Sequence, residues 1–315
     1  LIEDLDEKSK TSRVRALKCL GIFNSQHTLN VAFISSNEKK EMFSKIIPAV
    51  AAWDIYNPWA KYLQLFSTHP LTAKRIMRLN DQCALFNLKP LIDFAYAKKM
   101  KEEQVGKTMI PEFLTDLCID TIPFLLFISL LPLLIIYLIL RPLFNYKISP
   151  EFTIILGFGL MVLAFGLFVK TKFKYKNGFR LFNIDRLLGH INVSSVRPVP
   201  AIIEGQIVGR GIPGFILSED LYLQDKTGLL YLDYHFGLGL MDLIFAITKS
   251  KKLIGQRVRV KGWYRRSIIP FFQIKTLETE DGKIHRNYAD NVNVIWSILF
   301  FLIGLLLFLD LLITY

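Results

Sequence analysis

The sequence predicts a multidomain membrane protein with an α-helical N-terminal region, three transmembrane helices and a small β-barrel of the OB type. The chain of 315 residues is 52% hydrophobic and has a positive mean hydropathy. This apolar excess is concentrated in three runs instead of being spread over one core. Between residues 184 and 288 the pattern changes from helical spacing to alternation of apolar and polar residues, which indicates strands.

Residues 1–96 have the spacing of helices. Residues 13–20 are amphipathic, and residues 38–52 place apolar side chains at helical intervals. A further helix begins at Asn57-Pro58, with proline at a first-turn position, and ends at Ser67-Thr68-His69-Pro70. We expect one more helix from about Leu71 onward.

The chain opens at Leu1 with residues typical of the middle of a helix, and we see no signal peptide. We therefore expect it to be a fragment of a longer protein. Residues 97–121 are expected to link the helical region to the membrane. The three cysteines are widely separated and form no C-x-x-C motif, so a reducing compartment is the simpler interpretation.

Three apolar runs, each roughly 18–21 residues long, can cross a hydrocarbon core of about 30 Å. They cover residues 122–140, 152–170 and 294–314. Buried core helices are the alternative, but such helices rarely run this long without charge. The sequence therefore predicts an integral membrane protein of the cell membrane.

Lysine and arginine are unevenly distributed around the first two runs, and the formal net charge of the chain is +12. The connector 141–151 carries only two basic residues, whereas the segments before residue 122 and after residue 169 carry clusters of them. The positive-inside rule places the connector outside, and it places the N-terminal region and the barrel in the cytoplasm. The third run then leaves the C-terminus outside.

Five strands are predicted within residues 184–288. They cover residues 201–209, 221–225, 228–233, 256–264 and 271–277. The second and third form a hairpin across Lys226-Thr227, with Asp225 and Gly228 as turn residues. Glycines inside the strands and the strand number favour a small closed barrel of the OB type. The apolar insertion 234–248 is too short to span and is expected to lie on the membrane surface.

A basic and aromatic cluster follows one predicted strand: Arg257, Arg259, Lys261, Trp263, Tyr264, Arg265 and Arg266. OB folds use such faces to bind single-stranded nucleic acid. The alternative is a solvated strand face beside anionic lipid headgroups, which the neighbouring spans make geometrically natural. We favour the second interpretation, so the lipid bilayer, and not nucleic acid, is the expected partner.

One short motif carries chemical information. Phe66-Ser67-Thr68-His69-Pro70-Leu71, followed by Arg75-Ile76 and Leu79, resembles the closing motif of the HtpX-like and CAAX-prenyl-protease group of membrane zinc endopeptidases. Family members usually have a second proline where this chain has Leu71. The resemblance covers about the first ninety residues. The appended barrel also resembles one found in some prokaryotic HtpX-like proteins.

The resemblance implies a zinc ion held by two histidines of H-E-x-x-H and a downstream glutamate, with the motif glutamate as general base. No H-E-x-x-H occurs in this chain, so these ligands are expected upstream of Leu1 and no metal ligand is assigned here. By resemblance, His69 and Arg75 face the catalytic cleft and support the substrate carbonyl or its oxyanion. Alternatively, His69 only caps the last helix and Arg75 pairs with a surface carboxylate.

The sequence therefore predicts the C-terminal portion of a zinc-dependent membrane endopeptidase that acts on membrane or misfolded proteins. Zn²⁺ is the cofactor expected in the full-length parent, and the partners expected are the bilayer and a protein or peptide substrate. The fragment alone is expected to be inactive and to hold no zinc. Two alternatives remain: a non-catalytic, membrane-anchored barrel protein that binds lipid, peptide or a protein partner, and a membrane-tethered nucleic-acid binder.

Overall fold

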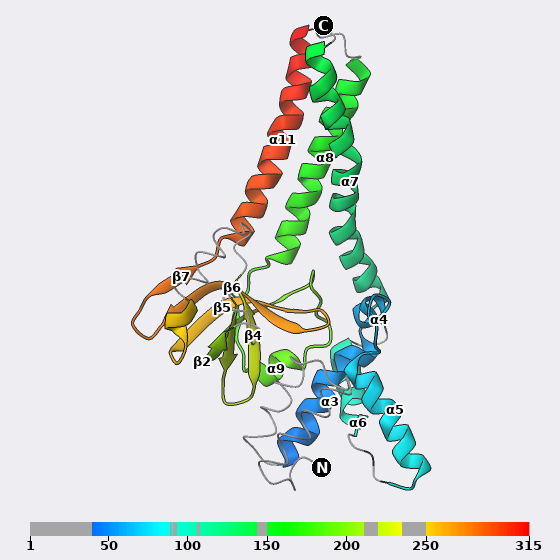
Figure 1. Ribbon diagram of the computed structural model, residues 1–315, viewed down its shortest axis with the longest axis vertical. Helices are drawn as coiled ribbons and strands as arrows, with labels where there is room; N and C mark the ends of the chain where they lie inside the picture. The colour runs from blue at the N-terminus through cyan, green and yellow to red at the C-terminus, as the bar shows by residue number, and fades with distance from the viewer. Residues whose placement is uncertain are drawn as a thin grey trace.

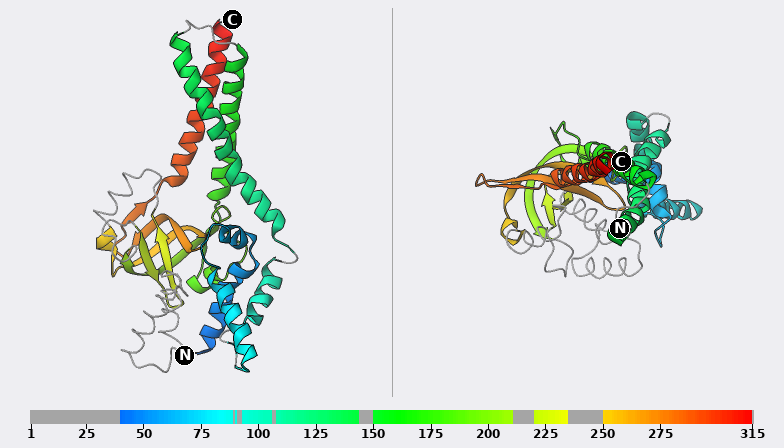
Figure 2. Two further views of the ribbon diagram at one scale, coloured as in Figure 1. Left: turned by 45° about the vertical axis from the view of Figure 1, so that its right-hand side comes forward. Right: turned by 90° about the horizontal axis from the view of Figure 1, so that it is seen from above.

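Three long helices extend from one end of the molecule, and a barrel and a group of shorter helices occupy the other end (Figures 1 and 2). The computed structural model describes residues 40–88, 90, 93–105, 108–143, 150–210, 220–234 and 250–314. The predicted segments 13–20 and 234–248 lie outside these residues, except for Tyr234. The barrel and the helical region thus share one end of the long helices, which agrees with placing both on the same side of a bilayer. Which side this is stays a prediction.

The three long helices are α7 (Ile110–Leu143), α8 (Pro150–Lys174) and α11 (Ala289–Thr314). Each is long and apolar enough to cross a membrane, as the sequence predicts. Helix α7 begins well before the expected start at residue 122, so part of the expected linker is helix. Helices α8 and α11 pack closely, because Gly157 and Gly304 face each other: a Cβ on Gly304 would lie 2.7 Å from the Gly157 carbonyl oxygen.

The barrel is closed by five strands: β2 (Val199–Arg210), β3 (Leu221–Gln224), β4 (Leu229–Asp233), β5 (Arg257–Arg266) and β6 (Pro270–Thr279). Neighbours follow the order β2-β3-β4-β6-β5, and β5 also pairs with β2. All pairs are antiparallel except β4 with β6. Two short strands extend the sheet: β1 (Arg180–Leu181) beside β2 and β7 (Ile284–Arg286) beside β6. The five predicted strands and their closure are therefore confirmed.

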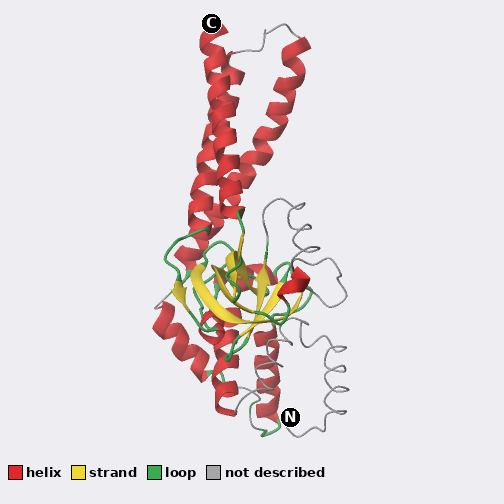
Figure 3. Cartoon of the chain, turned by 90° about the vertical axis from the view of Figure 1, so that its left-hand side faces the viewer, coloured by secondary structure: helices red, strands yellow, loops and turns green. Residues whose placement is uncertain are grey.

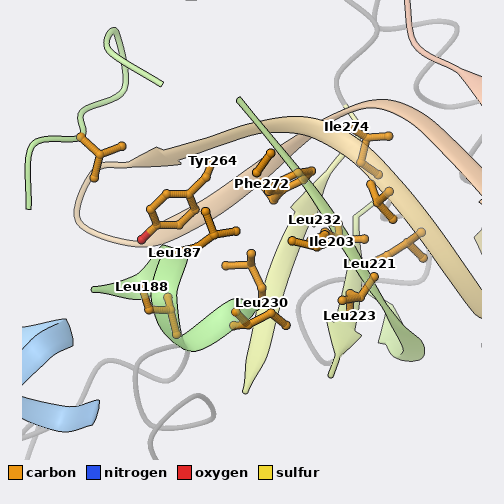
Figure 4. Close-up of a cluster of buried hydrophobic side chains, with 14 of the residues drawn as sticks. Leu187, Leu188, Ile203, Leu221, Leu223, Leu230, Leu232, Tyr264, Phe272 and Ile274 are labelled. Carbon is orange, nitrogen blue, oxygen red and sulfur yellow. The ribbon is translucent and has the colours of Figure 1, made fainter. Parts of the chain in front are cut away.

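The core of the barrel is apolar and includes a short helix, α9 (Ile184–Leu188). Leu187 and Leu188 of α9 point toward side chains of the strands, among them Leu230, Tyr264 and Phe272 (Figure 4). The turn between β3 and β4 holds α9 in place, because Asp225 accepts the backbone N–H of Ile184 at 2.9 Å. Asp225 also accepts the backbone N–H groups of Thr227 and Gly228, so its predicted turn role is confirmed.

One strand glycine is required by the closeness of the neighbouring strand. A Cβ on Gly262 of β5 would lie 2.1 Å from the Gln273 carbonyl oxygen of β6, well inside any real contact. The register between the two strands shifts at this point, which is typical of a bulge that increases local twist. The close approach of the β5 and β6 backbones therefore explains why this strand position requires glycine.

The helical region contains α3 (Lys40–Tyr56), α4 (Pro58–Gln64), α5 (Thr72–Leu85) and α6 (Ala95–Val105). Helix α4 begins where the sequence predicts: Asn57 is its N-cap and accepts the Trp59 backbone N–H at 2.8 Å. The expected break follows, and α5 then packs on α3. A short 3₁₀ helix, Ser250–Leu253, precedes β5. Figure 3 shows strands only in the layer between the long helices and the shorter ones.

Candidate functional site at the junction of barrel and helices

The two residues singled out by the motif lie on either side of the start of α5. His69 is in the connection from α4 to α5, with an exposed side chain, and Arg75 is half-buried in the first turns of α5. The Ser67 hydroxyl donates to the His69 carbonyl oxygen at 2.8 Å and accepts the His69 backbone N–H at 3.4 Å. The break between the helices is thus a defined turn that presents the imidazole to solvent.

His69 does not cap α5, so that alternative is wrong. The N-cap residue is Leu71, whose side chain makes no capping hydrogen bond. Instead, the Asp54 carboxylate of α3 accepts the backbone N–H of Ala73 at 3.4 Å, which satisfies one of the free N–H groups at the start of the helix. Residues Ala73 and Ile76 bury their side chains beneath this turn.

A second side-chain contact links the two ends of the connection between α4 and α5. The Lys74 ammonium donates to the side-chain carbonyl of Gln64 at the end of α4. Burial lowers the pKa of Lys74, the neighbouring Lys61 and Arg78 lower it further, and Asp54 opposes both effects. The segment from Leu65 to Leu71 is therefore held at both ends, and His69 lies between these two attachments.

Asp54 also connects this segment to the barrel through Arg266, the last residue of β5. The Arg266 guanidinium lies 3.4 Å from the Asp54 carboxylate and donates to the carbonyl oxygens of Val50 at 2.8 Å and Leu188 at 3.1 Å. It stacks 4.8 Å from the ring centroid of Trp53. Arg266 is only 1% exposed and Asp54 4%, so water cannot replace these contacts.

A second buried carboxylate, Asp116 of α7, joins three parts of the chain. It accepts from the Trp59 indole at 3.3 Å and from the Ser194 hydroxyl at 2.9 Å. Arg197 forms a two-point ion pair with it, at 2.9 Å and 3.1 Å. Asp116 is 2% exposed. Helix α4, the N-terminal part of α7 and the segment before β2 are thus fixed to one another.

Two further side chains of the helical region bind the backbone of the segment between α9 and β2. The Trp53 indole donates to the Val193 carbonyl oxygen at 2.7 Å, and the Asn57 amide donates to that of Ile191 at 2.7 Å. Both donors are buried. These contacts join residues more than 130 positions apart in the chain, so the barrel and the helical region form one continuous structure here.

The solvated face predicted for the basic and aromatic cluster is wrong for four of its residues. Trp263, Tyr264, Arg265 and Arg266 are buried, whereas Arg257 and Arg259 are exposed. The physical reason is that β5 alternates only over its first half and then enters the junction, where both of its faces are covered. The four buried residues are therefore not available to nucleic acid or lipid headgroups.

Arg265 is held in the same way as Arg266, on the opposite side of the strand end. It donates to Gln273 at 2.9 Å and to the carbonyl oxygens of Ser195 and Lys174. Burial lowers the pKa of Arg265 to about 10, against the opposing effect of Tyr175, so it stays charged at neutral pH. Burial also raises the pKa of Tyr264, and the neighbouring Arg266 partly offsets this.

The described part of the chain brings no three His, Cys, Asp or Glu side chains together as a metal site. It therefore contains no residues that fit the zinc ion implied by the resemblance. A hollow of about 460 Å³ lies at the rim of the barrel between Gln206, Arg257 and Glu280, and neither His69 nor Arg75 lines it. The predicted pair thus lies away from this hollow, on the helical region.

Sequence reasoning missed Asp54, Asp116 and Arg197. Each is unremarkable in its local pattern, and its partners are distant in the chain. Only the pairing of Trp and acidic residues on the same helix, Trp53 with Asp54, could have drawn attention to one of them.

Comparison of the chain with family models, curated proteins and solved structures finds no match.

Proposed function

We propose that this chain is the C-terminal portion of an integral-membrane zinc-dependent endopeptidase that acts on membrane or misfolded proteins. The observation that carries the proposal is the placement of His69 in a tethered, exposed turn directly before the helix that bears Arg75. A group that serves a cleft needs this combination of accessibility and fixed backbone.

In this proposal the imidazole of His69 and the guanidinium of Arg75 support negative charge that develops on the substrate carbonyl. In the parent protein a zinc ion would supply an activated water, and the residues that would hold it are proposed to lie upstream of Leu1. The described residues of this chain would bind and orient the substrate, and the upstream part would bind the metal. The fragment alone would therefore be inactive.

The barrel is proposed to be of the OB type, because its strands follow the order first, second, third, fifth and fourth, and the first then pairs with the fourth. The single parallel pair, β4 with β6, joins the third and fifth strands. We propose that the three apolar helices anchor this barrel and the helical region on the cytoplasmic side of the cell membrane, with the C-terminus outside.

The test uses the full-length parent, with His69→Ala, Arg75→Ala and Arg78→Ala as a matched control. Arg78 lies on the same helix and is exposed, so its loss removes the same charge without affecting the proposed cleft. We expect the first two changes to lower kcat by about 100-fold, with bound zinc unchanged, and Arg78→Ala to have little effect. Equal turnover in all three variants and the wild type would return His69 and Arg75 to a structural role.

A non-catalytic, membrane-anchored barrel protein is the alternative, and one observation favours it. Several large apolar side chains of the helical region are exposed, including Leu85 at 81% and Phe86 at 74%, which is typical of a surface that binds a partner. The coding sequence upstream of Leu1 separates the two: H-E-x-x-H followed by a glutamate ligand on a later helix supports the peptidase. Zinc content and casein cleavage of the purified fragment give a second test, since tight stoichiometric zinc with activity contradicts the predicted inactivity.

A further inference from the structure

We infer that Arg266 of the barrel is a positioning residue that sets the start of α5 through Asp54. The inference concerns the same site as the proposed function and rests on it for its catalytic consequence, although the mechanical coupling can be measured without any activity. In this view the barrel fixes the position of the segment that contains His69 and Arg75.

The Asp54 carboxylate divides its two oxygens between two parts of the molecule. One oxygen faces the Arg266 guanidinium and the other accepts the Ala73 backbone N–H, both at 3.4 Å. Asp54 is 4% exposed, so solvent cannot take over either contact. The orientation of the carboxylate, and with it the capping of α5, therefore depends on where Arg266 holds its charge.

Arg266 is itself fixed by groups from both sides of the junction. Its guanidinium donates to Leu188 in α9, which is packed into the barrel core, and to Val50, one turn before Asp54 on α3. The ring of Trp53 covers its face. Figure 1 shows α9 and α3 adjacent at this junction. A guanidinium can satisfy all of these acceptors at once because its donors form a rigid, planar fork.

Helix α5 has no substitute for this cap among its own residues. Its N-cap residue, Leu71, contributes no side-chain hydrogen bond, and its first turn has no acidic residue. If Arg266 is removed, Asp54 loses its countercharge. It also loses the contact that orients its other carboxylate oxygen toward the Ala73 backbone N–H. We expect the first turn of α5 to open more often, while the rest of α5 stays packed through Ile76.

The direct test is amide hydrogen exchange of residues 71–76 in the full chain, reconstituted in lipid nanodiscs, in Arg266→Met and Arg265→Met. Arg265 is the matched control, because it is the neighbouring residue of β5 and is equally buried, but its partners are Ser195, Lys174 and Gln273 and not Asp54. We expect Arg266→Met to speed exchange of the Ala73 amide by roughly fivefold, the size of a lost helix cap. Arg265→Met should leave that amide at the wild-type rate.

In this pair of variants, an unchanged Ala73 amide in Arg266→Met overturns the inference, and so does the same acceleration in both variants, which would show general loosening of the barrel. If either methionine variant fails to fold, the pair Arg266→Lys and Arg265→Lys replaces it, because a lysine keeps the charge but cannot reach all the acceptors. Asp54→Asn should restore part of the protection lost in Asp54→Ala, because it keeps an acceptor for Ala73. Equal exchange in these two variants would also count against the cap.

The catalytic consequence is measured in the full-length parent. Arg266→Met should lower kcat about tenfold more than Arg265→Met, with KM and bound zinc unchanged, because only the orientation of the supporting residues is affected. If the wild-type parent cleaves no peptide bond, the proposed function fails, and hydrogen exchange still decides the coupling. If the exchange responds but kcat does not, the positioning role is wrong and the proposed function stands.

Discussion

Replacement of Asp116 by alanine should destabilise the junction more than any other single change to an acidic residue of α7. Asp116 is 2% exposed and is bound by Trp59, Ser194 and Arg197. Alanine removes all of these contacts at once. The Trp59 indole and the Ser194 hydroxyl then lose their acceptor, and the Arg197 guanidinium keeps only the Glu112 carbonyl oxygen and the Phe173 ring.

The expected cost follows from burial. Removing one partner of a fully buried ion pair costs about 3–5 kcal/mol, because the other charge stays behind unpaired. The side chain of Arg197 is 22% exposed, so water recovers part of its solvation and the cost should fall at the lower end, about 3 kcal/mol. This corresponds to a change of roughly 150-fold in the unfolding equilibrium constant.

Asp120 provides the matched control, because it lies one turn further along α7 and pairs with Lys170 at 2.9 Å while 37% of its side chain is exposed. Asp120→Ala should cost no more than about 1 kcal/mol. Urea unfolding of the full chain in nanodiscs can be followed by tryptophan fluorescence, since Trp53 and Trp59 both donate across the junction. Equal midpoints for the two variants would refute the reasoning that Asp116 holds the junction together.

Three further changes test other parts of the fold. Gly262→Ala places a Cβ 2.1 Å from the Gln273 carbonyl oxygen, so we expect a loss of at least about 3 kcal/mol in barrel stability, measured by urea unfolding. Gly304→Ala places a Cβ 2.7 Å from the Gly157 carbonyl oxygen and should lower the Tm in detergent by forcing α8 and α11 apart. Burial lowers the pKa of His190 below its ordinary 6.5. Near that pH the folded state therefore binds fewer protons than the unfolded state. The stability that His190 contributes above pH 6.5 should be lost as the pH falls toward the folded-state pKa.

Matched variants make each of these outcomes specific. Gly209→Ala should be tolerated in the barrel, because nothing in the described part of the chain lies within 4 Å of its added Cβ. Gly166→Ala meets only Pro123, at 3.3 Å, and should change the Tm less than Gly304→Ala. For the histidine, His190→Gln should reduce the loss of stability between pH 7.5 and 5. An unchanged pH dependence in that variant would contradict the assignment.

Local patterns predicted the elements of this fold well, because each element depends mainly on neighbours in the sequence. Asn57-Pro58 began a helix, Asp225 made a turn, and long apolar runs became long helices. Barrel closure also followed from strand number and glycine placement. For the helices and the turn, the deciding interaction joins residues close in the chain or depends only on the apolar period.

The alternation of β5 failed as a guide to exposure at Arg265 and Arg266, because alternation assumes one solvated face. Where the strand passes into the junction, α3 and α9 cover Arg266, whereas the end of α8 and the segment before β2 cover Arg265. Similarly, the partners of Asp54 lie 212 residues away in Arg266 and 19 residues away in Ala73. No local period encodes such a pairing, so the junction could not be predicted from the sequence.

The choice of charged groups for this junction bears on its role. Trp53, Leu187 and Leu188 already bury a large apolar area there, and apolar side chains at the Asp54 and Arg266 positions could supply similar or greater stability. Apolar contacts, however, tolerate sliding, whereas a carboxylate between a guanidinium and a backbone N–H specifies one position. The charges are therefore best understood as fixing the register between barrel and helices. Under the proposed function, this register would also hold the segment with His69 and Arg75 in one arrangement relative to the barrel.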